Sequence, residues 1–272
     1  MSLLLREFGE NLKTIILPNS PISFIMLFFL VGMIVASYIG LEAMARLGAI
    51  VIPIAAIGFI AILLGVFPYC DVNNLFPILG KGTNAIFVTG SFRVSVFSDL
   101  LLLFLLVPFI KTNKNFKKVG WYSIMSSSVL LLFSALIFIL VVPYPTSLES
   151  FVPIYQLARL ISVGRFFSRI ESLFVFVWLI GGFLYLSIGF YFAIHTFKKA
   201  FKLEYMKPLI MPFALLIFSF SLMPKSLMST LKIEGNYLRN YSWTVGLALP
   251  LLVLIIASFF KRGEKKNDKK IC

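Results

Sequence analysis

Acidic side chains, histidine and cysteine are scarce in this sequence. Its 272 residues include 11 Asp and Glu, one His and two Cys. The sequence has no Ser-His-Asp or Cys-His arrangement, no glycine-rich phosphate loop and no carboxylate pair at catalytic spacing, so nothing in it predicts an active site. The two cysteines have no neighbours suited to binding a metal. We therefore expect a protein without catalytic residues, cofactor or bound metal.

Charge of either sign is also sparse. Charged residues make up 13% of the chain and hydrophobic residues 60%, and the mean hydropathy is +0.97. Soluble domains have roughly 25% charged and about 45 to 50% apolar residues. This composition excludes an ordinary soluble domain. It predicts an all-α integral membrane protein, a polytopic helical bundle that forms a single membrane domain over 1–272.

Long apolar stretches divide the sequence. A membrane-spanning helix needs about 20 mostly apolar residues, and the stretches that reach or approach this length number about seven. They are 22–41, 47–67, 85–110, 121–142, 172–194, 208–223 and 243–260. Around them we expect an outer loop over 1–21, an amphipathic outer helix over 148–163, and a basic cytoplasmic tail over 261–272.

Basic residues outnumber acidic ones, which gives a formal net charge of +14. In a membrane protein Lys and Arg concentrate in cytoplasmic loops, and here they are densest in 111–118, 198–207 and 261–270. This pattern predicts a cytoplasmic C-terminus and contact with the lipid bilayer rather than with nucleic acid. Seven spans would then leave 1–21 outside without a signal peptide, so we expect upstream helices that are missing from this chain.

The apolar stretch 85–110 contains two ionisable residues, Arg93 and Asp99. A charge buried in hydrocarbon costs about 3 to 15 kcal/mol, so such residues normally face a cavity, a partner or a ligand. Small residues typical of an interrupted helix accompany them, namely Thr89, Gly90, Ser91, Ser95 and Ser98. Asp99 lies roughly 16 Å of helix rise from the end of the stretch. The pattern predicts a polar site at membrane depth.

Each candidate in this stretch also has a structural interpretation. Asp99 could line an aqueous path and meet a ligand ammonium or take a proton, or it could be a structural carboxylate. Arg93 could pair with Asp99 across a break in the helix. The favoured alternative is that the Arg93 side chain snorkels, so that its guanidinium reaches the outer membrane interface. A break in the helix would free backbone N–H and C=O groups at Ser95, Phe97 and Ser98, and these groups could bind the carboxylate or amine of an amino acid with help from the hydroxyls. Serines in membrane helices more often pack against neighbouring helices.

One further aromatic residue is a candidate outside this stretch. Trp178 lies about two turns inside the stretch 172–194. It could form the wall of a ligand pocket or fill space between helices, and packing is the favoured interpretation. Both alternatives stay open from the sequence alone.

Several motifs resemble the B subunit of spore germinant receptors, a branch of the amino acid–polyamine–organocation transporter superfamily. The match runs almost end to end. Its motifs are 5–9 (LREFG), 17–21 (LPNSP), 40–46 (GLEAMAR), 79–82 (LGKG), and 169–174 (RIESLF) continuing to Trp178 and 181–183 (GGF). The family usually has a Pro and a Gly at the break of its sixth helix, followed by Glu. The matching positions here are Val96, Ser98 and Asp99.

The resemblance implies a fold of two inverted five-helix repeats with the substrate site between discontinuous helices near the midplane. This chain would hold helices four to ten and lack the first two and most of the third, and 5–9 would match the end of the third. The implied ligand-binding residues are Ser95, Phe97, Ser98, Asp99 and Trp178.

The function that the resemblance implies is that of a receptor subunit in the inner membrane of the spore. It would bind a small germinant, an amino acid, and trigger germination together with an A-type membrane subunit and a C-type lipoprotein. The alternatives are a proton-coupled amino acid permease that uses Asp99, an autonomous seven-helix receptor, and a non-functional truncated copy.

Overall fold

A computed structural model describes residues 1–76, 82–90, 101–109, 113–144, 146–150, 152–161, 170–235, 241, 244, 248 and 250–258. Within these ranges all regular structure is helical. The chain divides into two compact units. The first comprises Met1–Ile78 and Thr112–Thr230, and the second comprises Leu79–Lys111 and Leu231–Cys272. Each unit is described by itself.

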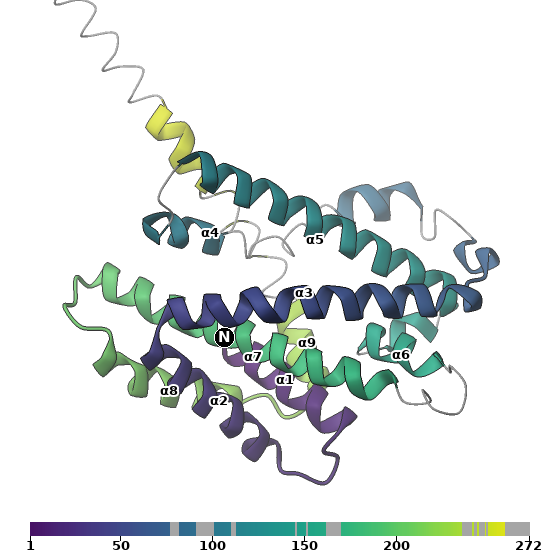
Figure 1. Ribbon diagram of the computed structural model, residues 1–272, viewed down its shortest axis with the longest axis horizontal. Helices are drawn as coiled ribbons and strands as arrows, with labels where there is room; N and C mark the ends of the chain where they lie inside the picture. Colours follow the sequence, from purple (N-terminus) through teal and green to yellow (C-terminus); the bar gives the residue numbers. More distant parts are fainter. Residues whose placement is uncertain are drawn as a thin grey trace, which may run out of the picture. The chain divides into compact units, whose positions relative to one another are not determined.

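Four helices of the first unit share one core. They are α1 (Ser2–Ile15), α2 (Ile22–Ile39), α7 (Ile170–Ala200) and α8 (Lys207–Ser221), drawn in purple and green in Figure 1. Fully buried side chains from all four helices fill this core, including Leu5, Phe29, Phe190 and Ile210. A methyl group at Gly32 would overlap the ring of Phe183, so α2 and α7 approach each other closely.

The other helices of the first unit form a second core. These are α3 (Leu41–Gly65), α5 (Asn113–Val141) and α6 (Pro153–Leu160). Buried side chains from the end of α3 and from α6 meet there, and Phe138 of α5 and Phe174 of α7 pack against them. Gly40 separates α2 from α3 at φ 105°, a backbone conformation that glycine adopts without steric cost.

The loop after α3 is tied to the end of α5. The backbone N–H of Asp71 and the Asn74 side-chain amide both donate to the carbonyl oxygen of Leu140, at 2.9 and 2.8 Å. The last four carbonyls of a helix lack partners within that helix, and Leu140 lies one residue before the end of α5. These two bonds therefore satisfy an otherwise unpaired group and fix where the loop runs.

We expect Asn74→Ala to lower the free energy of unfolding by about 1 kcal/mol, because it removes one of the two donors to Leu140. The neighbouring Asn73→Ala is the control, since the exposed Asn73 contributes its backbone N–H rather than its side chain to the loop. Unfolding of the purified protein in mixed detergent micelles with increasing dodecyl sulfate measures both variants. Equal losses of stability in the two variants would contradict a stabilising hydrogen bond from Asn74 to Leu140.

The described part of the second unit contains short helical segments. These are a π-helix at Ala85–Thr89, α4 (Leu101–Leu106), and a 3-10 turn at Val107–Phe109, followed later by helical residues 250–258. The helix α9 (Leu227–Ile233) crosses the division between the units. Reciprocal bonds between Ser226 and Ser229 cap its start.

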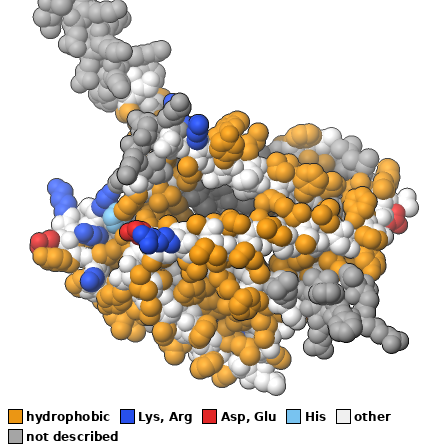
Figure 2. Space-filling model, in the orientation of Figure 1, with side chains coloured by type: hydrophobic (Ala, Val, Ile, Leu, Met, Phe, Trp, Pro, Cys, Tyr) orange, Lys and Arg blue, Asp and Glu red, His pale blue; other side chains and the backbone are white. Residues whose placement is uncertain are grey.

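Four helical stretches are long and apolar enough to cross a membrane. They are Ile22–Ile39, Leu41–Tyr69, Asn115–Val141 and Phe174–Ala200, and α8 is a shorter apolar helix. The expectation of an all-helical polytopic membrane protein is thus confirmed, whereas a count of seven spans is not reached within the described ranges. Hydrophobic side chains cover most of the face in Figure 2, and Lys and Arg gather toward the turn between α7 and α8.

Two expectations about secondary structure need correction. The segment 1–21 was expected to be an outer loop, although the resemblance matched 5–9 to the end of a helix. The structure has a helix over Ser2–Ile15, α1, because Leu5, Gly9 and Leu12 recur at helical spacing on its buried face. The segment 148–163 forms a shorter helix, α6, which begins at Pro153 and buries Leu157 and Ala158 in the second core. The tail 261–272 lies outside the described residues.

Candidate ligand cavity

Most of the site residues predicted from the sequence lie outside the described part of the chain. This holds for Arg93, Ser95, Phe97, Ser98 and Asp99, which therefore stay predictions. Trp178 is described, and it lies on α7 beside a cavity of the first unit. Among the predicted residues, Trp178 is thus the one from which the site can be built.

The cavity has a volume of about 610 Å³ and lies between α3 and α7. Trp178, Gly181 and Tyr185 line it from α7, Ile54 and Gly58 from α3, with Phe8 of α1 and Ile161 at the end of α6 contributing to its wall. Ligand sites of small molecules are typically hollows of about 300 to 1,000 Å³ with mostly apolar walls and a few polar groups. Trp178 and Tyr185 are the lining residues whose side chains contain a polar atom.

Aromatic rings form one wall of this cavity. The rings of Phe8 and Trp178 are stacked, with centroids 5.1 Å apart and an angle of 24° between their planes. Phe8 also contacts Phe29 of α2, at 6.5 Å between centroids. Stacked aromatic pairs add about 0.5 to 1.5 kcal/mol beyond the area they bury. The stack therefore joins α1, α2 and α7 at the edge of the cavity.

Two adjacent glycines on α7 have opposite surroundings. A methyl group added at Gly182 would overlap Phe8 Cε1 and lie 2.8 Å from Cδ1, whereas one added at Gly181 would meet no heavy atom within 4 Å. Gly182 is thus required for the close approach of α1 to α7. Gly181 instead opens onto the cavity, and a larger side chain there would occupy cavity space.

A buried ion pair lies on the same helix as Phe8. Arg6 is 5% exposed, and its Nη2 lies 2.7 Å and its Nε 2.9 Å from Glu10 Oε1. Its Nη1 also donates to the carbonyl oxygen of Ser221, at 3.5 Å, in the last turn of α8. Arg6 lies within the segment 1–21 that was expected to be an outer loop. The four-residue spacing of Arg6 and Glu10 is the signal that could have revealed a helical pair.

The described residues offer little for metal or nucleophilic chemistry. No group of three His, Cys, Asp or Glu within them could hold a metal ion. Cys70, which follows the apolar stretch Leu41–Tyr69, donates its thiol to the carbonyl oxygen of Val66 at 3.9 Å, and burial raises the pKa of this thiol. A protonated thiol is a poor nucleophile and metal ligand. The cavity lining instead offers an apolar surface for noncovalent contacts.

Comparison with known proteins gives a consistent family. The family model described as "Spore germination protein" matches residues 1–229. Spore germination protein YndE of Bacillus subtilis (strain 168) is 32% identical over 83% of this chain and 62% of its own length. Spore germination protein KB of the same organism is 27% identical over 97% of this chain and 72% of its own length. Spore germination protein A2, also of this organism, is 28% identical over 96% of this chain and 71% of its own length.

No solved structure gives a significant match. This chain spans less than two thirds of the length of YndE. The motifs on which the resemblance rested include residues 5–9 and 178–183, and both contribute to the cavity wall through Phe8, Trp178 and the glycine pair. Since the family model covers residues 1–229 of 272, this chain belongs to the family of spore germination proteins.

Proposed function

We propose that this chain is a membrane subunit of a nutrient germinant receptor and that its cavity binds the apolar side chain of a small germinant amino acid. The observation that carries the proposal is the aromatic-walled cavity between α3 and α7 in a member of a spore germination family. The relatives are called spore germination proteins, which supports a role in that process.

The lining of the cavity favours an apolar group over a charged one. Its described residues are aliphatic, aromatic or glycine, and none of them is ionisable at neutral pH. A charged ligand group would lose its hydration there and gain no ion pair in return. The carboxylate and ammonium of an amino acid need polar partners, which the described lining of this cavity does not supply. Ser95, Phe97, Ser98 and Asp99 stay ligand-binding residues predicted from the sequence.

A ligand in this cavity would act by shifting a conformational equilibrium. A ligand changes such an equilibrium only through contacts that differ between the two states. The wall contains the Phe8–Trp178 stack between α1 and α7, so a ligand that packs against it would favour one arrangement of these helices. We propose that an A-type membrane subunit and a C-type lipoprotein receive this change, in the inner membrane of the spore, with the C-terminus of this chain in the cytoplasm.

Filling the cavity should weaken ligand binding without unfolding the protein. We expect Gly181→Leu to weaken binding of leucine, valine or phenylalanine, whichever binds, by at least tenfold, because the new side chain occupies open cavity space. The control is Ala135→Leu, which places the same leucine side chain on the exposed face of α5. Scintillation proximity with the radiolabelled amino acids and the chain in lipid nanodiscs measures both variants. Unchanged binding by a folded Gly181→Leu protein would reject the cavity as the site.

A further inference from the structure

Among the described residues, four glycines line the cavity between α3 and α7, and they are of two kinds. They are Gly58 and Gly65 of α3 and Gly181 and Gly182 of α7. A methyl group added at Gly65 would lie 3.0 Å from Ile161 Cδ1, and one added at Gly182 would overlap Phe8. At Gly58 and Gly181 an added methyl group would meet no heavy atom of the described residues within 4 Å. Close packing therefore explains the first two glycines but not Gly58 and Gly181.

The stability of the helices does not explain Gly58 and Gly181 either. Glycine inside a helix is less favourable than alanine, because it loses more backbone freedom on folding. Both glycines lie in the interior of long helices, and neither has the positive φ that would favour glycine there. What the two positions share is a border with open cavity space, which a side chain at either position would reduce.

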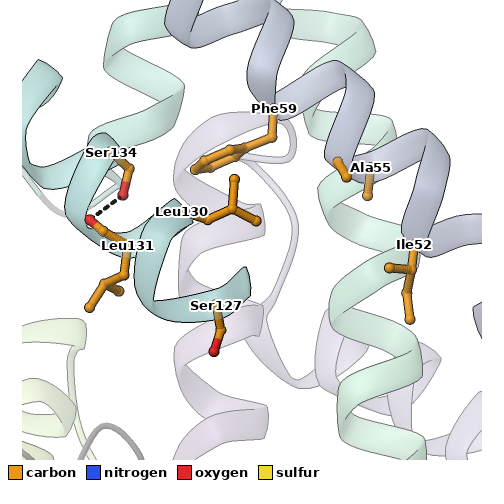
Figure 3. Close-up of a pocket in the computed structure, with 8 residues that line it drawn as sticks. Ile52, Ala55, Phe59, Ser127, Leu130, Leu131 and Ser134 are labelled. Carbon is orange, nitrogen blue, oxygen red and sulfur yellow. Dashed lines mark hydrogen bonds between the residues drawn. The ribbon is translucent and has the colours of Figure 1, made fainter. Parts of the chain in front are cut away.

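Gly58 lies at the centre of the α3 wall. The α3 residues that line the cavity at helical spacing, and so share one face of the helix, are Ile54, Gly58, Ala61 and Gly65. Ala55 and Phe59 lie at the border of this face, because they also line a separate groove of about 400 Å³ between α3 and α5. In Figure 3, Phe59 and Leu130 lie across from each other in that groove. The cavity is thus bounded by Phe59 toward α5 and has Gly58 in the middle of its wall.

Gly181 lies at the same level on the opposite wall. α3 and α7 run in opposite directions in Figure 1. Phe174 of α7 packs on the second core, to which Ile161 beside Gly65 also belongs. Counted from this end, Gly58 lies seven residues before Gly65, and Gly181 lies seven residues after Phe174. Seven residues correspond to roughly 10 Å of helix rise on either helix. The two glycines that border open space therefore lie across the cavity from each other.

From this register we infer that Gly58 and Gly181 set the upper size limit of the ligand side chain, so that the cavity accepts large apolar side chains. The inference rests on the proposed function, because it concerns the ligand of the same cavity. Where both walls lack a side chain, the space between the helices is left to the ligand. One methylene group in an apolar pocket changes the discrimination between ligands roughly 10- to 200-fold. A methyl group on either wall therefore excludes a large ligand side chain before it excludes a small one.

Binding of radiolabelled phenylalanine and valine to the full chain in lipid nanodiscs tests the size limit. We expect both to bind the unchanged chain, and Gly58→Ala to weaken phenylalanine binding at least fivefold relative to valine binding. Gly181→Ala should shift this ratio in the same direction. The control is Gly48→Ala on the same helix, roughly 15 Å of helix rise away. Its methyl group would meet Ile52 Cδ1 at 3.8 Å, an ordinary contact, so the ratio should not change.

The possible failures can be told apart. If both amino acids bind but their ratio stays the same in Gly58→Ala, or shifts equally in Gly48→Ala, the size limit alone is refuted. An unchanged chain that binds valine and not phenylalanine also refutes it. If neither amino acid binds, the proposed function fails and the size limit with it. Thermal unfolding is measured in parallel, and a lower unfolding temperature of Gly58→Ala would show that the added methyl group meets other atoms, which contradicts the open space at this position.

Discussion

Replacing Arg6 by methionine is expected to lower the free energy of unfolding by about 3 kcal/mol. The change removes the cation that lies 2.7 Å from Glu10 and leaves the carboxylate largely buried, with its side chain 15% exposed. Breaking a buried ion pair from one side costs about 3 to 5 kcal/mol, and the remaining exposure of Glu10 favours the lower value. The Arg6 bond to the Ser221 carbonyl is lost as well, which loosens α1 from α8.

The chain supplies a matched control for this variant. Arg46 and Glu42 have the same four-residue spacing and lie 2.6 Å apart, but their side chains are 79% and 80% exposed. We expect Arg46→Met to change the stability by less than about 0.5 kcal/mol. The double variant Arg6→Met/Glu10→Leu should recover most of the loss, because it leaves no unpaired charge. Titration with dodecyl sulfate measures all three, and an Arg6→Met protein as stable as Arg46→Met would refute the buried pair.

Alanine substitutions at Gly181 and Gly182 of α7 should change the stability of the protein in opposite directions. We expect Gly182→Ala to destabilise the protein by about 1 to 3 kcal/mol, because its methyl group overlaps the Phe8 ring. That ring is stacked on Trp178 and packed on Phe29, so it has little room to move. Gly181→Ala should instead stabilise the protein by about 0.5 to 1 kcal/mol, since alanine is the better helix former and its methyl group meets open space.

Removing the Phe8 ring should make an added methyl group about as well tolerated at Gly182 as at Gly181. In a Phe8→Ala background the added methyl group of Gly182→Ala no longer meets the ring, so its cost should fall below about 0.5 kcal/mol. Contacting residues show coupling of this kind in double-mutant cycles. Thermal unfolding in detergent followed by circular dichroism gives the four stabilities. Additive effects of Phe8→Ala and Gly182→Ala would show that the two residues do not touch.

Hydropathy located the long apolar helices because burial in lipid requires continuous apolar sequence. α2, α3, α5 and α7 correspond to stretches that composition alone distinguishes. The helix α1 escaped this criterion, because Arg6, Glu10 and Asn11 interrupt its apolar residues, and Arg6 and Asn11 are themselves buried. The resemblance matched only 5–9 to a helix, and reading 1–21 for helical spacing would have extended that helix to the rest of α1.

The cavity could be anticipated only in part. Trp178 was a candidate because of its depth in an apolar stretch, but its partner Phe8 lies 170 positions earlier in the sequence, and no local pattern links the two. The different environments of Gly181 and Gly182 likewise depend on where α1 packs, which their own neighbours in sequence do not specify. The polar candidates Ser95, Ser98 and Asp99 lie outside the described residues and stay predictions.

Photo-crosslinking with a diazirine analogue of leucine tests most directly whether the cavity binds the side chain of an amino acid. The chain is irradiated with the analogue in lipid nanodiscs, and the labelled peptides are identified by mass spectrometry. Our account predicts labels on Phe8, Trp178 or Tyr185, all of which line the cavity, and their loss in Gly181→Leu or with excess unlabelled amino acid. Labels that avoid these residues, or that persist in Gly181→Leu, would contradict it.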